Sequence, residues 1–371
     1  MPDTATTLLV LTIAVALAFD FTNGFHDTAN AVATTIGTRA LTPRTAIALS
    51  AVLNLMGAVV TTQFLHSKVA NTIGGLLSPA RGVAPEMIVA ALLGAIAWNL
   101  ITWRAGLPSS SSHALIGGLI GMGLAAYGLG AVRWDKVYPV LIALVTSPLA
   151  GLLIAYVVMV ILLNLCRRLN PGRANVGFRR LQILSASFVS FSHGANDAQK
   201  TMAIIALALV STHHLKSFSV PLWVVLLAGA TIGFGTYAGG WRIIRTMSTR
   251  IIKLTPVDGF AAETVGASVI QVATQVGLPV STTHVVAGSV IGVGATHRIS
   301  AVRWGVARRI AAAWVLTVPA SAAMAAGVAL LVSAIGWVAG FTTVALACLA
   351  LLLLSRRRPP VPAKRQLSPA T

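Results

Sequence analysis

The chain has 371 residues, of which 56% are hydrophobic and only 9% are charged, and its mean hydropathy is +0.84. Soluble domains carry about 25% charged residues, so this composition excludes a water-soluble enzyme. A net charge of +19 would suggest a nucleic-acid partner for a soluble chain, but here the basic residues lie in short loops between apolar runs. We therefore expect no nucleic-acid partner and interpret the charge as a signal of membrane topology.

Apolar runs of about 20 residues, each long enough to cross a membrane once, recur along the chain. They predict an all-α polytopic membrane protein with about 11 spans. The first run lacks the basic n-region of a signal peptide and is expected to be retained. The first and sixth spans are too long for one straight helix across a ~30 Å core, so we expect broken or re-entrant helices. The expected spans are 5–38, 45–65, 84–103, 108–127, 138–165, 181–212, 220–240, 257–276, 279–297, 310–334 and 337–354.

The basic residues fall mainly on one side of these spans. With the N-terminus outside, 21 of the 27 Lys and Arg residues lie in inner loops or in the C-terminal tail, 5 lie outside, and Lys200 lies within a span. Cytoplasmic loops carry the excess of Lys and Arg, so we expect a multi-pass cell-membrane protein with the N-terminus outside and the C-terminus in the cytoplasm. The Pro-rich basic tail is expected to be disordered and to rest near anionic membrane lipid.

Three motifs occur twice, at offsets of 170, 171 and 170 residues. They are FTNGFHD at 21–27 and FSHGAND at 191–197, GLPSSSSH at 106–113 and GLPVSTTH at 277–284, and AVRW at 131–134 and 301–304. This indicates a duplication, and five spans in each copy would place the second copy upside down, as is typical of secondary transporters. We expect a first inverted repeat at 1–166, a basic cytoplasmic linker at 167–180, a second inverted repeat at 181–335, an extra span at 336–355 and a basic disordered tail at 356–371.

Acidic side chains lie inside the expected spans. They are Asp20, Asp27, Asp197 and Glu263, with Asp258 near the edge of a span. A charge at bilayer depth costs about 2.5 kcal/mol or more, so such residues usually face a cavity and mark a transport pathway. A helix-packing hydrogen bond or an interfacial position is the alternative, and it stays open above all for Asp20 and Asp258.

The motifs around the two repeated aspartates supply groups for binding a cation. Asp27 with Asn30, and Asp197 with Lys200, stand at i and i+3 and so share a helix face. The glycine of each motif allows a helix break or the close approach of another backbone. Carboxylate, amide and imidazole groups are cation ligands. Lys200 would place a tethered positive charge beside Asp197, whereas a buried ion pair with only a structural role is the alternative.

The second pair of motifs places consecutive hydroxyl groups after a proline, at Ser109 to Ser112 and at Ser281 to Thr283. Proline followed by Ser or Thr is typical of a helix start, where free N–H groups and the positive end of the helix dipole favour an anion. Two such helix starts that converge from opposite repeats would bind a tetrahedral oxyanion. Close helix packing is the alternative. His113 and His284, which end these motifs, either orient the loops or titrate.

With these motifs, the chain resembles the PiT family of inorganic phosphate transporters over nearly its whole length. The resemblance implies that phosphate is contacted by six hydroxyl groups, those of Ser110, Ser111, Ser112, Ser281, Thr282 and Thr283. It implies charge-balancing or coupling roles for Asp27 and Asp197, with Asn30 and Asn196 as nearby cation or substrate ligands. From their positions in the sequence we add Lys200 and Glu263 to the coupling or cation groups, and His26, His113 and His284 as site-orienting residues. GFHDTANAVAT with HGANDAQK looks most like the low-affinity, proton-coupled bacterial permeases. Sodium-coupled relatives tend to carry amides where this chain has His26 and Lys200, which favours protons over sodium.

We therefore expect a secondary active transporter that imports inorganic phosphate by ion symport, with H⁺ as the coupling ion and Na⁺ as the alternative, and with no cofactor. Transport of phosphate as a divalent metal complex, and a homo-oligomeric state, stay open. A sulfate permease of the same family and a passive anion channel are competing interpretations. An intramembrane hydrolase is a remote one, since the duplicated Ser/Thr clusters offer no single nucleophile and no nucleophile elbow occurs.

Overall fold

The computed structural model describes residues 4–64, 66–78 and 82–356. This part of the chain is helical apart from its loops and one isolated antiparallel bridge between Leu77 and Val132. The all-α class expected from the sequence is confirmed, whereas the tail at 357–371 lies outside the described residues. The elements are α1 (Thr4–Gly37), α2 (Pro43–Phe64), α3 (Lys68–Gly74), α4 (Pro85–Ala105), α5 (Ser111–Tyr127), η2 (Leu129–Ala131), α6 (Trp134–Cys166), α7 (Pro171–Ser211), α8 (Leu222–Ala238), α9 (Trp241–Arg245), the π-helical turn η3 (Thr246–Arg250), α10 (Pro256–Gln275), α11 (Thr282–His297), η4 (Ile299–Ala301), α12 (Trp304–Ile335) and α13 (Trp337–Arg356).

Five helices, α1, α2, α4, α6 and α12, are each long and apolar enough to cross a membrane. A sixth span results if α8 and the segment Trp241–Arg250, which is bent from it by 60°, are taken together. The described residues therefore define a multi-pass membrane protein but do not confirm the expected count of 11 spans. The helix α7 is longer than any of these, at 41 residues, but the polar motif residues lie in its middle.

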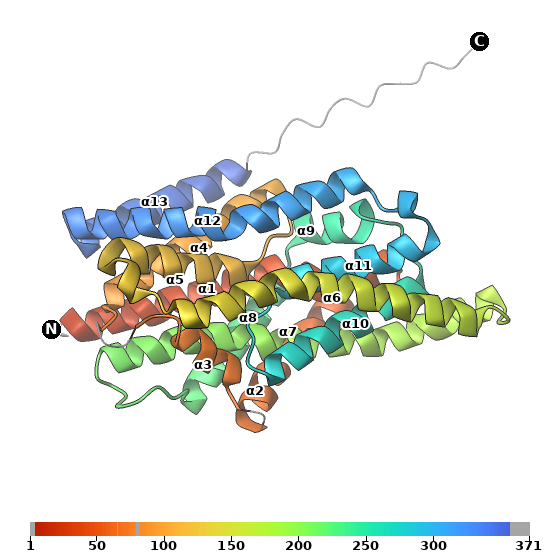
Figure 1. The fold of residues 1–371 in the computed structure, drawn as a ribbon, viewed down its shortest axis with the longest axis horizontal. Coiled ribbons are helices and arrows are strands. Elements are labelled where there is room, and N and C mark those ends of the chain that lie inside the picture. The colour runs from red at the N-terminus through yellow and green to blue at the C-terminus, as the bar shows by residue number, and fades with distance from the viewer. Residues whose placement is uncertain (1–3, 65, 79–81, 357–371) are drawn as a thin grey trace, which may run out of the picture.

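Four of the expected spans form the arms of two helical hairpins, α4 with α5 and α10 with α11. The open end of the α4–α5 hairpin is closed by the backbone N–H of Ala84, which donates to the Tyr127 hydroxyl at 3.0 Å. The open end of the α10–α11 hairpin is closed by His297, whose Nε2 lies 2.7 Å from Asp258 Oδ1. Figure 1 shows the first hairpin in the half of the molecule that holds the N-terminus and the second in the other half. Each hairpin therefore enters the bundle from its own end.

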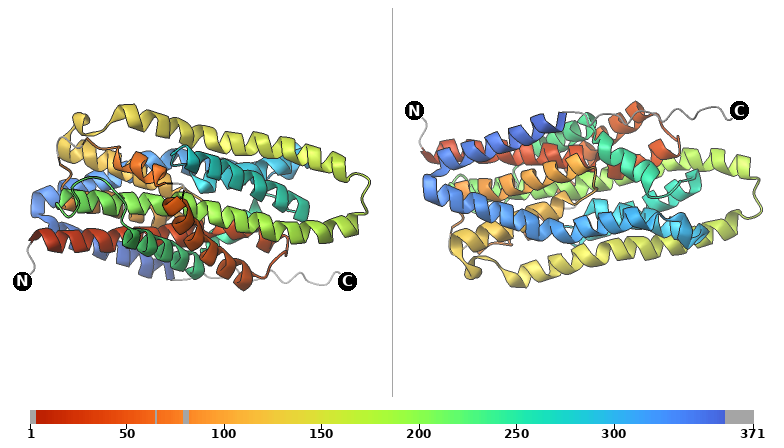
Figure 2. Two further views of the ribbon diagram at one scale, coloured as in Figure 1. Left: turned by 90° about the horizontal axis from the view of Figure 1, so that it is seen from below. Right: turned by 90° about the horizontal axis from the view of Figure 1, so that it is seen from above.

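The long helices interlock the two halves of the chain. The second arm of each hairpin packs against a long helix of the other half: α5 against α12, and α11 against α6. In the same way α2 packs against α7, and α1 packs against α8. The views in Figure 2 show α6, α7 and α12 running along nearly the whole long axis of the molecule. The tips of the hairpins are therefore enclosed by helices from both halves.

The expected breaks in the first and sixth spans are absent, because the glycines of the motifs serve close packing instead. Both α1 and α7 are continuous helices. A Cβ atom on Gly24 would lie 2.3 Å from the carbonyl oxygen of Ile232, and one on Gly194 would lie 2.0 Å from that of Asn54. Only glycine allows these backbones to approach so closely. Of the two interpretations that the sequence left open, the structure favours close backbone approach.

Candidate functional site

The two Pro-Ser motifs form the tips of the hairpins, and each begins a helix as the sequence predicted. Ser110 is the N-cap of α5 and its Oγ accepts from the backbone N–H of His113 at 3.1 Å. Ser281 is the N-cap of α11 and its Oγ accepts from the backbone N–H of His284 at 3.2 Å. These caps direct the first turns of both helices, with their free N–H groups, towards the interior of the protein.

The two tips meet inside the bundle, although they are about 170 residues apart in the sequence. The Ser112 hydroxyl donates to the carbonyl oxygen of Val280 at 3.3 Å. The rings of His113 and His284 are in edge-to-face contact, with centroids 4.3 Å apart. His284 also stacks on Trp314 of α12, whose indole N–H donates to the carbonyl oxygen of Pro108 at 3.1 Å. The structure thus brings both hydroxyl-rich turns and both motif histidines together.

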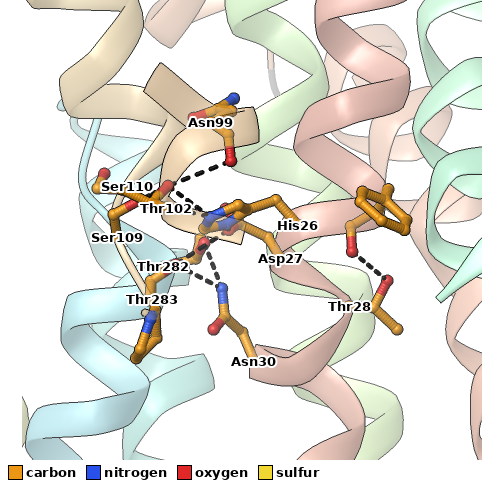
Figure 3. Close-up of polar contacts among 12 residues, drawn as sticks. His26, Asp27, Thr28, Asn30, Asn99, Thr102, Ser109, Ser110, Thr282 and Thr283 are labelled. Atoms are coloured by element: carbon orange, nitrogen blue, oxygen red, sulfur yellow. Dashed lines mark hydrogen bonds and ion pairs between the residues drawn. The ribbon is translucent and has the colours of Figure 1, made fainter. Parts of the chain in front are cut away.

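The first Gly-x-x-Asp motif, on α1, faces these tips (Figure 3). The Thr283 hydroxyl donates to Asp27 Oδ1 at 3.1 Å and accepts from the Asn30 amide at 2.8 Å. His26 places Nδ1 at 3.0 Å from Asp27 Oδ1 and Nε2 at 3.2 Å from the Thr102 hydroxyl. His26 therefore connects the aspartate to the end of α4.

The second motif, on α7, faces the same space from the other side. Lys200 Nζ donates to Asp197 Oδ1 at 2.6 Å, to the Ser112 hydroxyl at 2.5 Å and to the carbonyl oxygen of Val280 at 3.2 Å. Asn196 donates to the Thr274 hydroxyl at 2.8 Å. The Lys200 ammonium is fully buried, so it is held entirely by oxygen atoms of both hairpin tips and of its own helix.

A third buried group, His193, joins the two aspartates and was not assigned a role from the sequence. Ligand atoms of Asp27, His193 and Asp197 all lie within 4.8 Å of one another. Asn54 Oδ1 lies 3.1 Å from His193 Nδ1, and Nε2 of the same ring lies 3.5 Å from Asp197 Oδ2. When Nδ1 donates to Asn54, Nε2 keeps its lone pair towards the carboxylates, which is the arrangement of a cation ligand. The i, i+4 spacing of His193 and Asp197 was the signal available in the sequence.

Several polar atoms around the tips have no hydrogen-bond partner among the described residues. They include Ser111 Oγ, Asn30 Oδ1, Asn196 Oδ1, Asp197 Oδ2, both ring nitrogens of His113 and Nε2 of His284, and each is buried. Buried polar groups in native proteins nearly always have a partner, so this concentration of unpaired donors and acceptors fits a site for a polar ligand.

Glu263 lies apart from the hairpin tips, in a cluster of its own. Its carboxylate accepts from the Thr34 hydroxyl, from the Gln182 amide at 3.1 Å and from the Ser185 hydroxyl at 2.5 Å. These partners come from α1 and α7, while Glu263 belongs to α10. All four side chains are buried. The structure thus does not bring Glu263 into contact with the predicted phosphate ligands.

The other two acids flagged by the sequence have different surroundings. Asp258 forms the capping box of α10, since its carboxylate accepts from the backbone N–H of Thr255 at 2.8 Å. Together with its contact to His297, this gives Asp258 a structural role in the second hairpin. Asp20 is fully buried on α1, about two turns before Asp27.

The apolar bundle and its buried polar centre define a polytopic membrane transport protein. The chain belongs to the phosphate transporter family, whose model matches residues 23–175 and again residues 167–325. It is therefore a phosphate transporter and not an enzyme, which excludes the hydrolase interpretation. The double match agrees with the duplicated motifs.

Individual relatives support this assignment. The chain is 50% identical to a probable low-affinity inorganic phosphate transporter of Rhizobium meliloti (strain 1021), over 86% of this chain and 95% of the relative. It is 44% identical to a protein of the same description from Bacillus subtilis (strain 168), over 86% of this chain and 96% of the relative. A solved structure described as "The sodium-dependent phosphate transporter" matches with a TM-score of 0.81 and 28% identity, covering 89% of this chain and all of that one.

Proposed function

We propose that this protein imports inorganic phosphate as a proton-coupled symporter that works by alternating access. One observation carries the proposal: the Lys200 ammonium lies where the second motif helix and both hairpin tips meet, bound to three oxygen atoms. A protein cation at this point provides permanently the positive charge that a bound sodium ion would supply. Proton binding to the nearby carboxylates then remains as the coupling step.

The hairpin tips are the proposed phosphate site. Six hydroxyl groups are buried at the two helix starts, and the Ser111 hydroxyl has no partner among the described residues. Free N–H groups and hydroxyls at helix N-termini replace the water around a tetrahedral anion without any arginine. Phosphate carries its own O–H group, which sulfate lacks at neutral pH. Asp27 and Asp197 offer acceptors for this group, so we propose that phosphate is preferred over sulfate. The proposed ligands are Ser110, Ser111, Ser112, Ser281, Thr282 and Thr283.

Asp27, Asp197 and Glu263 are the proposed proton-coupling groups, and Asn30 and Asn196 complete the polar lining. Asp27 has His26 and Thr283 as neighbours but no lysine, whereas Asp197 is already paired with Lys200. Asp27 is therefore the carboxylate near the tips whose charge is least balanced. We propose that, of the carboxylates at the tips, Asp27 is the one that takes part in proton coupling.

The cluster of Asp27, His193 and Asp197 supports a divalent metal as a companion of phosphate. Two carboxylates and one imidazole suit a divalent transition-metal ion. If phosphate travels as a neutral metal complex with one proton, each cycle moves about one positive charge inward, which is worth ~2.3 kcal/mol per 100 mV. This supports roughly fifty-fold accumulation at 1.4 kcal/mol per decade.

Sodium coupling is the second candidate, and the same cluster favours it together with the similarity to a transporter described as sodium-dependent. In this case a sodium ion would lie between Asp27 and Asp197. The Lys200 ammonium already occupies one side of Asp197, and this is why protons remain the first choice.

For the architecture we propose two repeats of opposite orientation, at 1–166 and 181–335, with the N-terminus outside and the C-terminus in the cytoplasm. The two hairpins that enter from opposite ends and the exchange of packing partners between halves support this proposal. The basic residues of the segment 167–180 would then lie on the cytoplasmic side, although the structure continues α7 through its second part.

Uptake of labelled phosphate by proteoliposomes tests the proposal. An inward proton gradient is expected to drive accumulation in sodium-free buffer, and excess sulfate is expected to compete weakly. Uptake that requires a sodium gradient and ignores a proton gradient would establish the second candidate instead. Equilibration without accumulation under any gradient would indicate a passive channel.

A further inference from the structure

Two short segments of the chain, one in each half, reach across to the hairpin tip of the other half. On α3, the Thr72 hydroxyl donates to the carbonyl oxygen of Gly277 at 2.6 Å. After α9, the Thr246 hydroxyl donates to the carbonyl oxygen of Gly106 at 3.0 Å. Gly277 and Gly106 are equivalent residues, because each opens one of the two GLP motifs. The two contacts therefore form a matched pair.

The matched pair extends to the local geometry. Both glycines have positive φ, +79° at Gly277 and +64° at Gly106. Each threonine hydroxyl also donates to the carbonyl oxygen four residues earlier in the chain, at 3.2 Å for both Thr72 and Thr246. The approach is close, since a Cβ atom on Gly277 would lie 3.1 Å from Lys68 Cβ. These glycines thus end the first arm of each hairpin and present a carbonyl group to a helix of the opposite half.

The position of α3 places it between the candidate site and one end of the molecule. The backbone N–H groups of Val69 and Ala70 both donate to Gln199, the residue before Lys200, at 3.1 and 3.3 Å. On its other side α3 borders a cavity of about 900 Å³, whose lining includes Asn71, Gly74 and Lys216. Figure 1 shows α3 in the half of the molecule nearer the N-terminus. α3 therefore contacts both this cavity and the residue next to Lys200.

The segment after α9 has the corresponding position on the other side of the site. It contacts the end of α4 through Thr246, and α9 itself contacts the same end through Arg242, which donates to the carbonyl oxygen of Arg104 at 3.0 Å. The Arg242 guanidinium lies over the ring of Trp103, 4.8 Å from its centroid. In Figure 1 α9 lies on the side of the α4–α5 hairpin away from the N-terminus.

We propose that Thr72 and Thr246 are the gating residues of the two mouths of the transporter. The Thr72–Gly277 contact closes the mouth on the N-terminal side, and the Thr246–Gly106 contact closes the opposite one. The inference rests on the proposed alternating access, but not on the coupling ion. Both contacts are formed here, which corresponds to an occluded state, and each outward or inward opening breaks one contact while the other holds.

Loss of one hydroxyl should therefore open one mouth, and loss of the other hydroxyl should open the opposite mouth. Thr72→Val removes the bond to Gly277 and shifts the population towards opening on the N-terminal side. Thr246→Val shifts it towards the other side. Loss of one neutral hydrogen bond should raise the population that is open at that mouth about fivefold. A merely structural role would change access from both sides equally, or change only the amount of folded protein.

The experiment measures access to the site with a single reporter cysteine. The free cysteines Cys166 and Cys348 are replaced by serine, and Ser111→Cys provides a thiol between the hairpin tips. A membrane-impermeant methanethiosulfonate is added to either side of oriented vesicles, and an N-terminal epitope identifies the side. Thr72→Val is expected to accelerate labelling about fivefold from the N-terminal side only, and Thr246→Val from the opposite side only.

Thr146→Val is the matched control, because among the described residues the Thr146 hydroxyl donates only to the carbonyl oxygen of Ile142 in its own helix, at 2.9 Å. It should label like the parent, as should Thr72→Ser and Thr246→Ser, which keep the hydroxyl. Equal acceleration from both sides, or none, in folded valine variants would overturn the gating assignment. If a valine variant does not insert into the membrane, the serine variant of the same residue is used. It must label like the parent, and a change in the side from which it is labelled would also overturn the gating assignment. Labelling needs no ion gradient, so failure of proton coupling would leave this result unchanged.

Discussion

Lys200 and Ser112 form a contact between the halves of the protein that has a neutral counterpart across the site. The Lys200 ammonium donates to the Ser112 hydroxyl at 2.5 Å, and the Asn30 amide donates to the Thr283 hydroxyl at 2.8 Å. Asn30 and Lys200 occupy equivalent motif positions, as do Ser112 and Thr283. Each motif helix thus holds the hairpin tip of the other half, but only one of the two contacts carries a charge. This asymmetry is the basis of the proposed choice of coupling ion.

Replacing Lys200 by asparagine should restore the amide that the first motif carries and leave room for a cation beside Asp197. We expect phosphate uptake by Lys200→Asn to become dependent on sodium, with stimulation of about 5- to 150-fold, the usual range for coupling between two ligands. The measurement is uptake of labelled phosphate in proteoliposomes with and without sodium. Lys136→Asn, at an exposed position on α6, is the control and should keep the ion requirement of the parent. An unchanged requirement in Lys200→Asn refutes the role of a tethered cation.

The sequence predicted the helical class, the duplicated motifs and the helix starts at Ser110 and Ser281, since these depend on local composition and capping chemistry. It did not distinguish a membrane span from one arm of a hairpin, because both are apolar runs of similar length. The arms are revealed only by contacts such as Ala84 with Tyr127, which are remote in sequence.

The same reason explains what was missed at the site. His193 becomes a candidate ligand only through its neighbours Asn54 and Asp27, which are 139 and 166 residues away. The coupling role of Glu263 stays a prediction, but its partners Thr34, Gln182 and Ser185 share no motif that would have placed them beside it. Spacing along one helix was visible in the sequence, whereas the pairing of different helices was not.

Asp27→Asn and Asp197→Asn should both abolish proton-driven uptake, yet they should differ in stability. Asp197→Asn leaves the buried Lys200 ammonium without its carboxylate, which typically costs about 3–5 kcal/mol. Asp27→Asn keeps an oxygen that can accept from Thr283, so its cost should be about 1 kcal/mol. Thermal unfolding in detergent measures this difference. The double variant Asp197→Asn with Lys200→Gln should regain most of the lost stability, and equal destabilisation by both single variants would argue against the buried ion pair.

Gly194→Ala tests the packing that positions the second motif. The added methyl group would lie 2.0 Å from the carbonyl oxygen of Asn54, so α7 and α2 must move apart. Overpacking of this kind costs about 1–3 kcal/mol, and the shift should also reduce uptake because His193 contacts the same Asn54. Gly327→Ala is the matched control, since a Cβ at this position in α12 meets no atom within 4 Å. It should be neutral or stabilising by up to about 1 kcal/mol, and a similar loss in both variants would contradict the close helix contact.

Glu263→Gln separates a coupling role of Glu263 from a purely structural one. The glutamine amide can still accept from Thr34 and Gln182 and can donate to Ser185, so the loss of stability should be about 1 kcal/mol. We expect the variant to exchange phosphate across the membrane but to lose net uptake driven by a proton gradient, because a side chain without a titratable proton cannot couple to it. Exchange and net uptake are compared in the same proteoliposomes, with Asp135→Asn at an exposed ion pair as the control. If net uptake and exchange both persist in Glu263→Gln, Glu263 has only a structural role, in which it joins α1, α7 and α10 by hydrogen bonds.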